Sequence, residues 1–371
     1  MNFSFSPEQE ELRRYAAQWL ADKSASASVR ELMETEEGFD RALWREAAEM
    51  GWQAMAIPEG YGGAGFGFLE LVVLLEEQGA ALFPSPFFST VVLAATALLE
   101  AGSEEQKTTW LPRIASGEVV ATLAVTEPSG DWTESGIQAI ARRTGDGWVL
   151  NGEKSFVLDG HTADVIVVAA LVEGEVSLFL VEGDAVGVTR TVLETMDQTR
   201  KLASVRLDEV VVDGDARLTG SDWGTVERVH RTAAVALAAE QVGGARRCLD
   251  MAVAYAKDRH QFGRPIGSFQ AIKHMCADML VQVESARSAA YYAGWAVSEG
   301  SAEVPELAAL AKSYCSEAFY RCAADNIQIH GGIGFTWEHD AHLYFKRAKS
   351  SELLFGSPAH HRRLLADLIG I

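Results

Sequence analysis

The stretch YAKDRHQFGRPIGSFQAIKHMCADM, residues 255–279, contains the break between the two longest helical patterns of the chain. Apolar and small residues recur with a helical period over roughly 224–257, and the same pattern resumes over 269–298. Between them FGRPIGS (262–268) combines two glycines with a proline, residues that interrupt helices. The sequence therefore predicts two long helices joined by a tight connection.

Helical patterns also occupy both ends of the chain. A third helix is predicted near 304–329, followed by the turn HGGIG (330–334) and further helix. Near the N-terminus the runs 69–82 and 91–99 carry apolar residues on a helical period. The first helix is expected to start at the capping box SPEQ (6–9), because serine and glutamine three residues apart satisfy free amides reciprocally. No basic segment followed by an apolar one precedes it, so a signal peptide is not expected.

Residues 118–218 have a different pattern. Short β-branched runs such as EVVATLAV and ADVIVVAALV are separated by Gly-Asp or Asn-Gly, which is typical of hairpins in an antiparallel sheet or barrel. The predicted fold class is therefore α+β. Its three segments are an N-terminal helical domain (1–115), a middle antiparallel β domain (116–223) and a C-terminal helical bundle (224–371).

Composition excludes several classes of function. A net charge of −20, from 52 acidic and 32 basic residues, argues against binding nucleic acid through its phosphates, although a local basic pocket can still hold a small anion. No apolar run approaches the roughly 20 residues of a membrane span. The four cysteines form no CxxC pair, and neither they nor the histidines at 330, 339, 342, 360 and 361 match a metal-ligand spacing. We therefore expect no bound metal, and we expect the protein to be cytoplasmic.

Four motifs, taken together, resemble the acyl-CoA dehydrogenase family. They are IPEGYGGAG (57–65), LAVTEP (123–128), the 255–279 stretch, and IQIHGGIGFTWEHD (327–340). The first motif contains a loose GxGxxG spacing, but no strand is predicted before it, which disfavours a dinucleotide fold of the Rossmann type. The order helical domain, β domain, helical bundle is also that of the family, and the motifs span most of the chain.

The resemblance implies FAD as cofactor and an acyl-CoA thioester as substrate. In the family a carboxylate takes a proton from the carbon α to the thioester, while the flavin accepts the β hydride. The electron-transfer flavoprotein is the expected acceptor. Family dimers share each FAD, whose ring lies against one subunit's β domain while the neighbour's bundle holds the pyrophosphate and adenosine.

The resemblance implies that several residues of the C-terminal helical bundle bind the cofactor. Arg259 offers a fork of donors for phosphate oxygens, and exposed glycine backbone lets a cofactor come close. The residues implied are Arg259, Gln261, Phe262, Gln270, Gln328, Gly331 and Gly332, with Thr126 of the β domain near the ring. Alternatively, Arg259 binds no cofactor and is a solvated charge at a helix end, where the helix dipole favours a cation.

Three segments depart from the family pattern. Phe355, in LLFGS, stands where the family carries its glutamate base, and a phenyl ring cannot take a proton; Glu352 nearby is expected to be a surface charge beside Lys349. Trp132 stands where a small serine approaches the pyrophosphate. In SFVLDG, Phe156 and Leu158 replace a Trp-x-Thr/Ser pair whose hydroxyl bonds the flavin, and leucine cannot donate.

Three hypotheses remain open at this point. The chain is one subunit of a heteromeric α2β2 dehydrogenase, resembling those that act on steroid side chains in actinobacteria, with a homologous partner subunit. Alternatively it is a homo-oligomer whose base is Glu240, a carboxyl in the apolar stretch 232–244 where burial would raise the pKa. In that stretch Glu240 could instead pair with Arg246 or Arg247. The third hypothesis is a non-catalytic scaffold that stabilises an active homologue.

Overall fold

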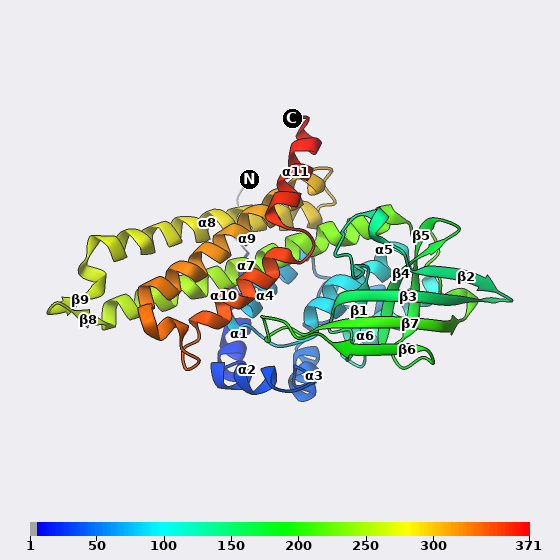
Figure 1. Ribbon diagram of the computed structural model, residues 1–371, viewed down its shortest axis with the longest axis horizontal. Helices are drawn as coiled ribbons and strands as arrows, with labels where there is room; N and C mark the ends of the chain where they lie inside the picture. Colours follow the sequence, from blue (N-terminus) through cyan, green and yellow to red (C-terminus); the bar gives the residue numbers. More distant parts are fainter. Residues whose placement is uncertain (1–5) are drawn as a thin grey trace. The chain divides into compact units, whose positions relative to one another are not determined.

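The computed structural model describes residues 6–371 as a mixture of long helices and one large sheet, as the predicted α+β class requires (Figure 1). Its packing divides the chain into two compact units. Unit 1 contains the chain up to Arg30 together with 68–83 and 234–371, and unit 2 contains 31–67 and 84–233. Each unit thus combines stretches that lie far apart in the sequence.

Unit 1 is helical. Both long predicted helices are confirmed to within two residues, as α7 (Trp223–Asp258), whose first turns belong to unit 2, and α8 (Gln270–Ser298). The other helices are α1 (Pro7–Lys23), α2 (Ser26–Met33, which crosses into unit 2), α4 (Phe68–Ala81), α9 (Val304–His330), α10 (Ala341–Leu353) and α11 (Pro358–Ile369). Two-residue strands β8 (His260–Gln261) and β9 (Arg264–Pro265) form a hairpin between α7 and α8, followed by the short helix η5 (Ile266–Ser268), and η6 (Gly331–Phe335) follows α9.

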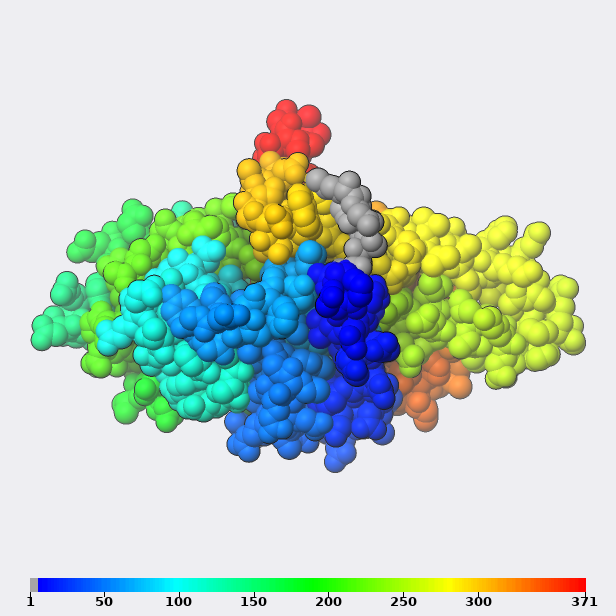
Figure 2. Space-filling view, turned by 180° about the vertical axis from the view of Figure 1, so that it is seen from behind, coloured from blue at the N-terminus to red at the C-terminus, as the bar shows by residue number. Residues whose placement is uncertain are grey.

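The start of α1 follows from its sequence. Ser6 Oγ accepts a hydrogen bond from Gln9 N at 3.2 Å, and Ser6 N donates to Gln9 Oε1 at 2.9 Å, which confirms the predicted capping box. Downstream, Arg13 Nη2 donates to Tyr291 OH on α8 at 2.8 Å. This bond joins α1, the deep blue segment in Figure 2, to α8 in yellow on the same face of unit 1.

Small residues let the helices of unit 1 approach closely. The core between α7, α8 and α9 is rich in alanine, for example Ala238, Ala290 and Ala311. At the crossing of α4 and α7, a Cβ added to Gly79 would lie 2.0 Å from Glu240 O, and one added to Gly243 would lie 1.7 Å from Glu76 O. Only glycine permits this backbone contact, which sets the place of Glu240.

Unit 2 contains the sheet and shorter helices. The helices are α3 (Arg41–Glu49), η1 (Glu59–Tyr61), η2 (Phe88–Ala94) continuing into α5 (Ala95–Ala101), α6 (Glu104–Ala115), η3 (Glu134–Gly136) and η4 (Gly214–Ala216). The strands are β1 (Ala121–Ala124), β2 (Ile140–Thr144), β3 (Gly147–Leu158), β4 (Val165–Val172), β5 (Glu175–Glu182), β6 (Val188–Val192) and β7 (Leu202–Val212). The glycine-rich loop 57–67 follows no strand of the described chain, so it is not part of a Rossmann dinucleotide-binding motif.

The sheet is mixed, and in this respect the expectation of a wholly antiparallel domain is wrong. The strand order is β1-β4-β2-β3-β7-β6, with β5 paired to β4. The pairs β2–β3, β3–β7, β4–β5 and β6–β7 are antiparallel as predicted, but β1 runs parallel to β4, with Ala121 opposite Val165, and β2 meets β4 in parallel at one residue. Hairpin turns set the direction only of strands that follow one another, and β1 and β4 are separated by two strands.

None of the helices in the part of the chain that the structure describes has the length and apolar character needed to span a membrane.

Candidate cofactor and active site

The ends of α7 and α9 meet through two stacked rings. Tyr255 and His330 lie with their ring centroids 4.3 Å apart and their planes at 28°. Arg259 follows one turn after Tyr255, since Arg259 N donates to Tyr255 O at 2.8 Å, and Gln328 lies in the last turn of α9. The stack therefore brings two groups predicted for the same cofactor to one end of unit 1, next to the β8–β9 hairpin (Figure 1).

The hairpin itself is exposed. Phe262 is 91% exposed at its tip with φ 52°, and it meets Phe269 edge-on at 6.0 Å. Gln261 Nε2 donates to His260 O at 2.8 Å, and Gln270 is exposed at the start of α8. The exposed Arg259 guanidinium makes no hydrogen bond or ion pair with any residue between 6 and 371, so its donors are available to a ligand.

The turn after α9 exposes backbone. Gly331 has φ 63°, and a Cβ added to either Gly331 or Gly332 would meet no atom of residues 6–371 within 4 Å. An anionic group can thus reach the main chain without a side chain in the way. An open glycine backbone, a free guanidinium and the exposed amide of Gln328 fit the phosphate and adenosine parts of a dinucleotide.

In unit 2, a buried ion pair anchors the segment that follows β1. Glu127 Oε1 accepts hydrogen bonds from Lys154 Nζ at 2.7 Å and from the backbone amides of Gln138 and Ala139, both at 2.9 Å. Burial lowers the pKa of the Lys154 ammonium to about 8. Thr126, buried next to Glu127, accepts a hydrogen bond at its carbonyl from Ser155 N at 2.8 Å. Thr126 therefore sits in a rigid frame.

The three substituted positions of unit 2 offer no side-chain donor of the expected kind. Phe156 has φ 58° at an irregularity in β3, and its ring is 43% exposed. Leu158 is only 3% exposed, and its carbonyl accepts from Thr122 Oγ1 at 2.6 Å. Trp132 packs edge-on against His230, with ring centroids 5.7 Å apart. The strand face of unit 2 thus does not fit a flavin ring as well as the bundle end of unit 1 fits phosphates.

No carboxylate occupies the predicted base position. Phe355 is 8% exposed with φ 57°, and its carbonyl accepts from His361 Nε2 at 2.8 Å. Glu352 pairs with Lys349 at 3.1 Å, which confirms that those two charges are neighbours. The turn after α10 is therefore closed around an apolar ring.

The other candidate base, Glu240, lies in a buried ion pair with a residue that the sequence did not indicate. Arg347 Nη1 on α10 donates to Glu240 Oε1 at 3.0 Å. Pairing with Arg246 is wrong, because Arg246 instead donates to Glu77 at 2.7 Å. The one available signal for Arg347 was a charge within the buried face of α10, beside Tyr344 and Ala348. The role of Glu240 as a base stays a prediction.

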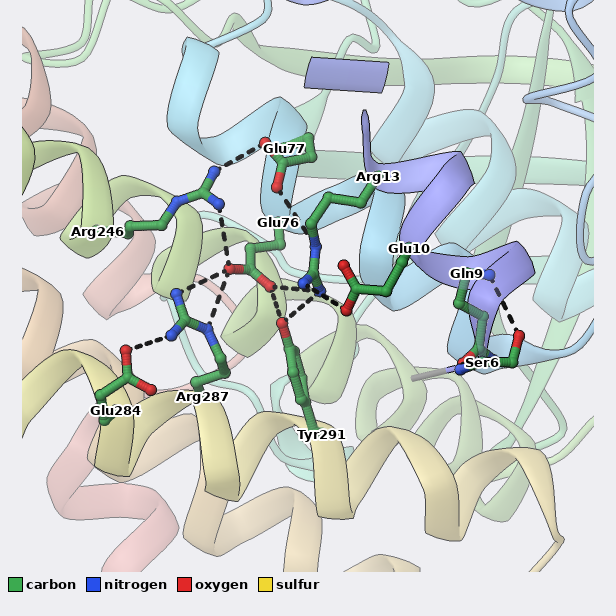
Figure 3. A network of polar contacts seen from close by, with 10 residues as sticks. All are labelled: Ser6, Gln9, Glu10, Arg13, Glu76, Glu77, Arg246, Glu284, Arg287 and Tyr291. Carbon is green, nitrogen blue, oxygen red and sulfur yellow. Dashed lines mark hydrogen bonds and ion pairs between the residues drawn. The ribbon is translucent and has the colours of Figure 1, made fainter. Parts of the chain in front are cut away.

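A second buried ionic cluster joins four helices of unit 1 (Figure 3). Glu76 on α4 has a side chain that is 0% exposed, and Arg13, Arg246 and Arg287 lie within 3.6, 3.8 and 3.3 Å of its carboxylate. Tyr291 OH also donates to Glu76, and burial together with this carboxylate raises the pKa of the phenol. These contacts come from α1, α7 and α8, so the cluster is internal to the bundle and stabilises its packing.

Family models match nearly the whole chain. The N-terminal, middle and C-terminal domains of acyl-CoA dehydrogenases match residues 6–118, 122–210 and 223–370. The chain belongs to the acyl-CoA dehydrogenase family. Its members are oxidoreductases that act on CH–CH bonds and use FAD, and the steroid acyl-CoA dehydrogenases are among the relatives of this chain.

Individual proteins show the same similarity. The chain is 41% identical to acyl-CoA dehydrogenase IpdE2 of Mycolicibacterium smegmatis, over 97% of this chain and 99% of that protein. It superposes with a TM-score of 0.92 and 32% identity on a chain of the ChsE4–ChsE5 complex from Mycobacterium tuberculosis, covering 100% of both. The Tcur3481–Tcur3483 steroid ACAD gives a TM-score of 0.88 and 33% identity over 98% of this chain and 97% of that one.

For an acyl-CoA dehydrogenase, the structure places the predicted cofactor residues in two groups. Six of them, namely Arg259, Gln261, Phe262, Gln328, Gly331 and Gly332, are exposed at the α7–α9 end of unit 1, with Gln270 at the adjacent start of α8. Thr126 lies buried in unit 2. Lys312 on α9 is a buried lysine that bonds the turn containing Phe355, and no sequence motif indicated it. Its signal was a charge among the small and apolar residues of the buried α9 face.

Proposed function

We propose that this chain is one subunit of a heteromeric acyl-CoA dehydrogenase that oxidises a bulky, steroid-derived acyl-CoA thioester. It would contribute the bundle end that holds the pyrophosphate and adenosine of an FAD. A homologous partner would contribute the β-domain face for the flavin ring and the catalytic base. The electron-transfer flavoprotein is the proposed electron acceptor.

The observation that carries this proposal is the asymmetry between the two groups of residues. Arg259 makes no hydrogen bond or ion pair within residues 6–371, and Gly331, which follows the His330 that stacks on Tyr255, presents open backbone. Leu158 is buried and cannot donate, and Phe355 fills the place of the family's base. In a homodimer each FAD would need both groups from this sequence, and one of them is deficient at every site.

The relatives support the same proposal. One solved structure with 32% identity is a complex of two different proteins, ChsE4 and ChsE5. Another, with 33% identity, is called a steroid ACAD. Both relationships favour a heteromeric enzyme and a polycyclic acyl group for this chain.

Within such an assembly, the residues of this chain bind and orient. Arg259 would donate to phosphate oxygens, each charge-assisted contact contributing roughly 1.5–3 kcal/mol. Gly331 and Gly332 would let the cofactor approach the main chain. The flavin supplies the hydride acceptor when it is bound. Removal of the α proton falls to a carboxylate, and the partner is its proposed source because Phe355 cannot take a proton.

Flavin content tests the proposal. We would purify the chain alone and after co-expression with a homologous dehydrogenase subunit, and measure absorbance near the flavin bands together with the molar mass of each assembly. The expected result is little FAD in the chain alone and two FAD per α2β2 tetramer. A homo-oligomer that carries one FAD per chain and reduces it with an acyl-CoA would refute the proposal.

The two remaining hypotheses predict different results in the same experiment. A homo-oligomeric enzyme with Glu240 as base would be yellow and active when purified alone. A scaffold would co-purify with the partner, but substitution of Arg259 would leave the flavin content of the complex unchanged. The ion pair between Glu240 and Arg347 disfavours the first of these, because that carboxylate is already engaged.

A further inference from the structure

Lys312 is a fully buried lysine with a complete set of hydrogen-bond acceptors. Its side chain is 0% exposed in the middle of α9. Lys312 Nζ donates to Ser316 Oγ at 3.0 Å and to three carbonyls, Ser351 O at 3.1 Å, Glu352 O at 3.2 Å and Gly356 O at 3.2 Å. An ammonium has three N–H donors, and these four acceptors more than use its capacity.

The three carbonyls belong to the end of α10 and the turn that follows it. The last carbonyls of a helix have no partner within the helix and need one from elsewhere. Lys312 supplies that partner to Ser351 and Glu352 in the last turn of α10 and, at the same time, to Gly356 beyond its end. One side chain therefore binds both sides of the turn and closes it.

The turn has a backbone conformation that it would not adopt alone. Phe355 has φ 57° and Gly356 has φ 98°, so two consecutive residues lie in the left-handed region. For a bulky residue such as phenylalanine this conformation is unfavourable and persists only where the surroundings impose it. The bond from Lys312 to Gly356 O and the bond from His361 Nε2 to Phe355 O hold the turn from two directions.

Ser316, one of the hydrogen-bond partners of Lys312, also bonds a residue of α7. Gln241 Nε2 donates to Ser316 Oγ at 3.0 Å, and Gln241 is the neighbour of Glu240 in the sequence. A second link runs parallel to this one, since Arg347 on α10 bonds Glu240. The turn is thus connected through α9 and α10 to the same part of α7.

We propose that Lys312 is a positioning residue, which fixes the turn Leu353–Ser357 and so determines where the backbone of residue 355 lies. The turn is the one that holds the base in the family pattern, and here its geometry is set by a lysine on α9 and not by the side chain at position 355. The inference concerns unit 1 alone and does not depend on whether the chain acts with a partner subunit.

Amide hydrogen exchange in the full-length chain tests this inference. In Lys312→Met, the amides of 353–357 should lose at least tenfold in protection, while the amides of α8 keep theirs. Lys154→Met is the matched control, because Lys154 is also 0% exposed and bonds a carbonyl, Val125 O, but in unit 2. It should leave the protection of 353–357 unchanged. Unchanged protection of the turn in Lys312→Met would overturn the inference.

Two further variants separate positioning from packing. Lys312→Arg keeps a charged donor and should restore part of the lost protection; no improvement over Lys312→Met would mean that packing alone explains the loss. Should Lys312→Met fail to fold, Ser316→Ala removes a single partner and should raise exchange in the turn about threefold. Ser313→Ala is its control on the same helix, since Ser313 Oγ bonds Leu310 O, and the two serine variants behaving alike would also overturn the inference.

Discussion

Glu240 and Arg347 form an ion pair at 3.0 Å in which the two side chains are only 7% and 3% exposed. The pair joins α7 to α10, at a point where Gly79 lies against the backbone of Glu240. The guanidinium gives the buried carboxylate a partner of opposite charge, without which burial of either charge would be costly. The contact makes Glu240 a structural element of unit 1 whether or not it takes part in catalysis.

Glu240→Gln separates these roles. Because the change leaves Arg347 buried with an uncharged neighbour, we expect the free energy of unfolding to fall by about 3 kcal/mol. In the assembled enzyme the rate of flavin reduction by acyl-CoA should stay within a few-fold of the wild type, measured by stopped-flow absorbance. Arg347→Met is the matched variant and should destabilise to a similar degree. A loss of reduction of a thousandfold or more, with ligand binding intact, would instead identify Glu240 as the base.

Arg259→Ala is expected to weaken FAD binding without destabilising the chain. Loss of a charge-assisted phosphate contact costs roughly 1.5–3 kcal/mol, or about 10- to 150-fold in the dissociation constant of FAD. The melting temperature of the FAD-free protein should not change, since the guanidinium makes no hydrogen bond or ion pair with a residue of the described chain. Fluorescence titration of FAD into the assembled enzyme measures the effect. Lys257→Ala, an exposed charge two residues earlier, is the control, and equal effects of both variants would contradict the assignment.

Glu76→Gln should destabilise unit 1 strongly. The change removes the negative charge that Arg13, Arg246 and Arg287 surround, and breaking a buried ionic network costs roughly 3–5 kcal/mol. Glu10→Gln is the control, because Glu10 pairs with Arg13 at 3.3 Å but is 55% exposed and should cost less than about 1 kcal/mol. Denaturant unfolding followed by circular dichroism compares the two. Similar midpoints for both variants would show that the cluster contributes little.

The contribution of the buried Lys312 to the free energy of unfolding should depend on pH. Burial lowers the pKa of Lys312 to about 7, below its ordinary value of 10.5. Between these two values the unfolded chain binds more protons at this site than the folded chain, so the contribution of Lys312 to stability rises with pH. The difference in unfolding free energy between wild type and Lys312→Met should therefore grow by at most about 1.4 kcal/mol per pH unit from pH 7 upward. Unfolding curves at pH 7, 8 and 9 measure it, and a constant difference would rule out the lowered pKa.

Much of this molecule followed from local sequence. Helix α1 begins directly after its N-cap Ser6, because the capping box SPEQ needs no distant contact. Helix α7 ends before the glycine and proline of 262–268, and α8 begins after them. The β segment was recognised from its alternating runs and turns. The direction of β1 was not, since its partner β4 lies about forty residues away and no turn connects them.

The sequence by itself determined the family and the order of helical and β segments, and it placed Phe355 at the position predicted for the base, because these depend on which residues stand at given positions. The partners of the charged residues were decided by tertiary structure alone. Glu240 meets Arg347 rather than Arg246, and Lys312 meets carbonyls about forty residues away, since burial leaves each charge only the groups that packing brings within about 3 Å. Which groups come within this distance depends on how α4, α7, α9 and α10 cross, and a local sequence pattern does not predict these crossings.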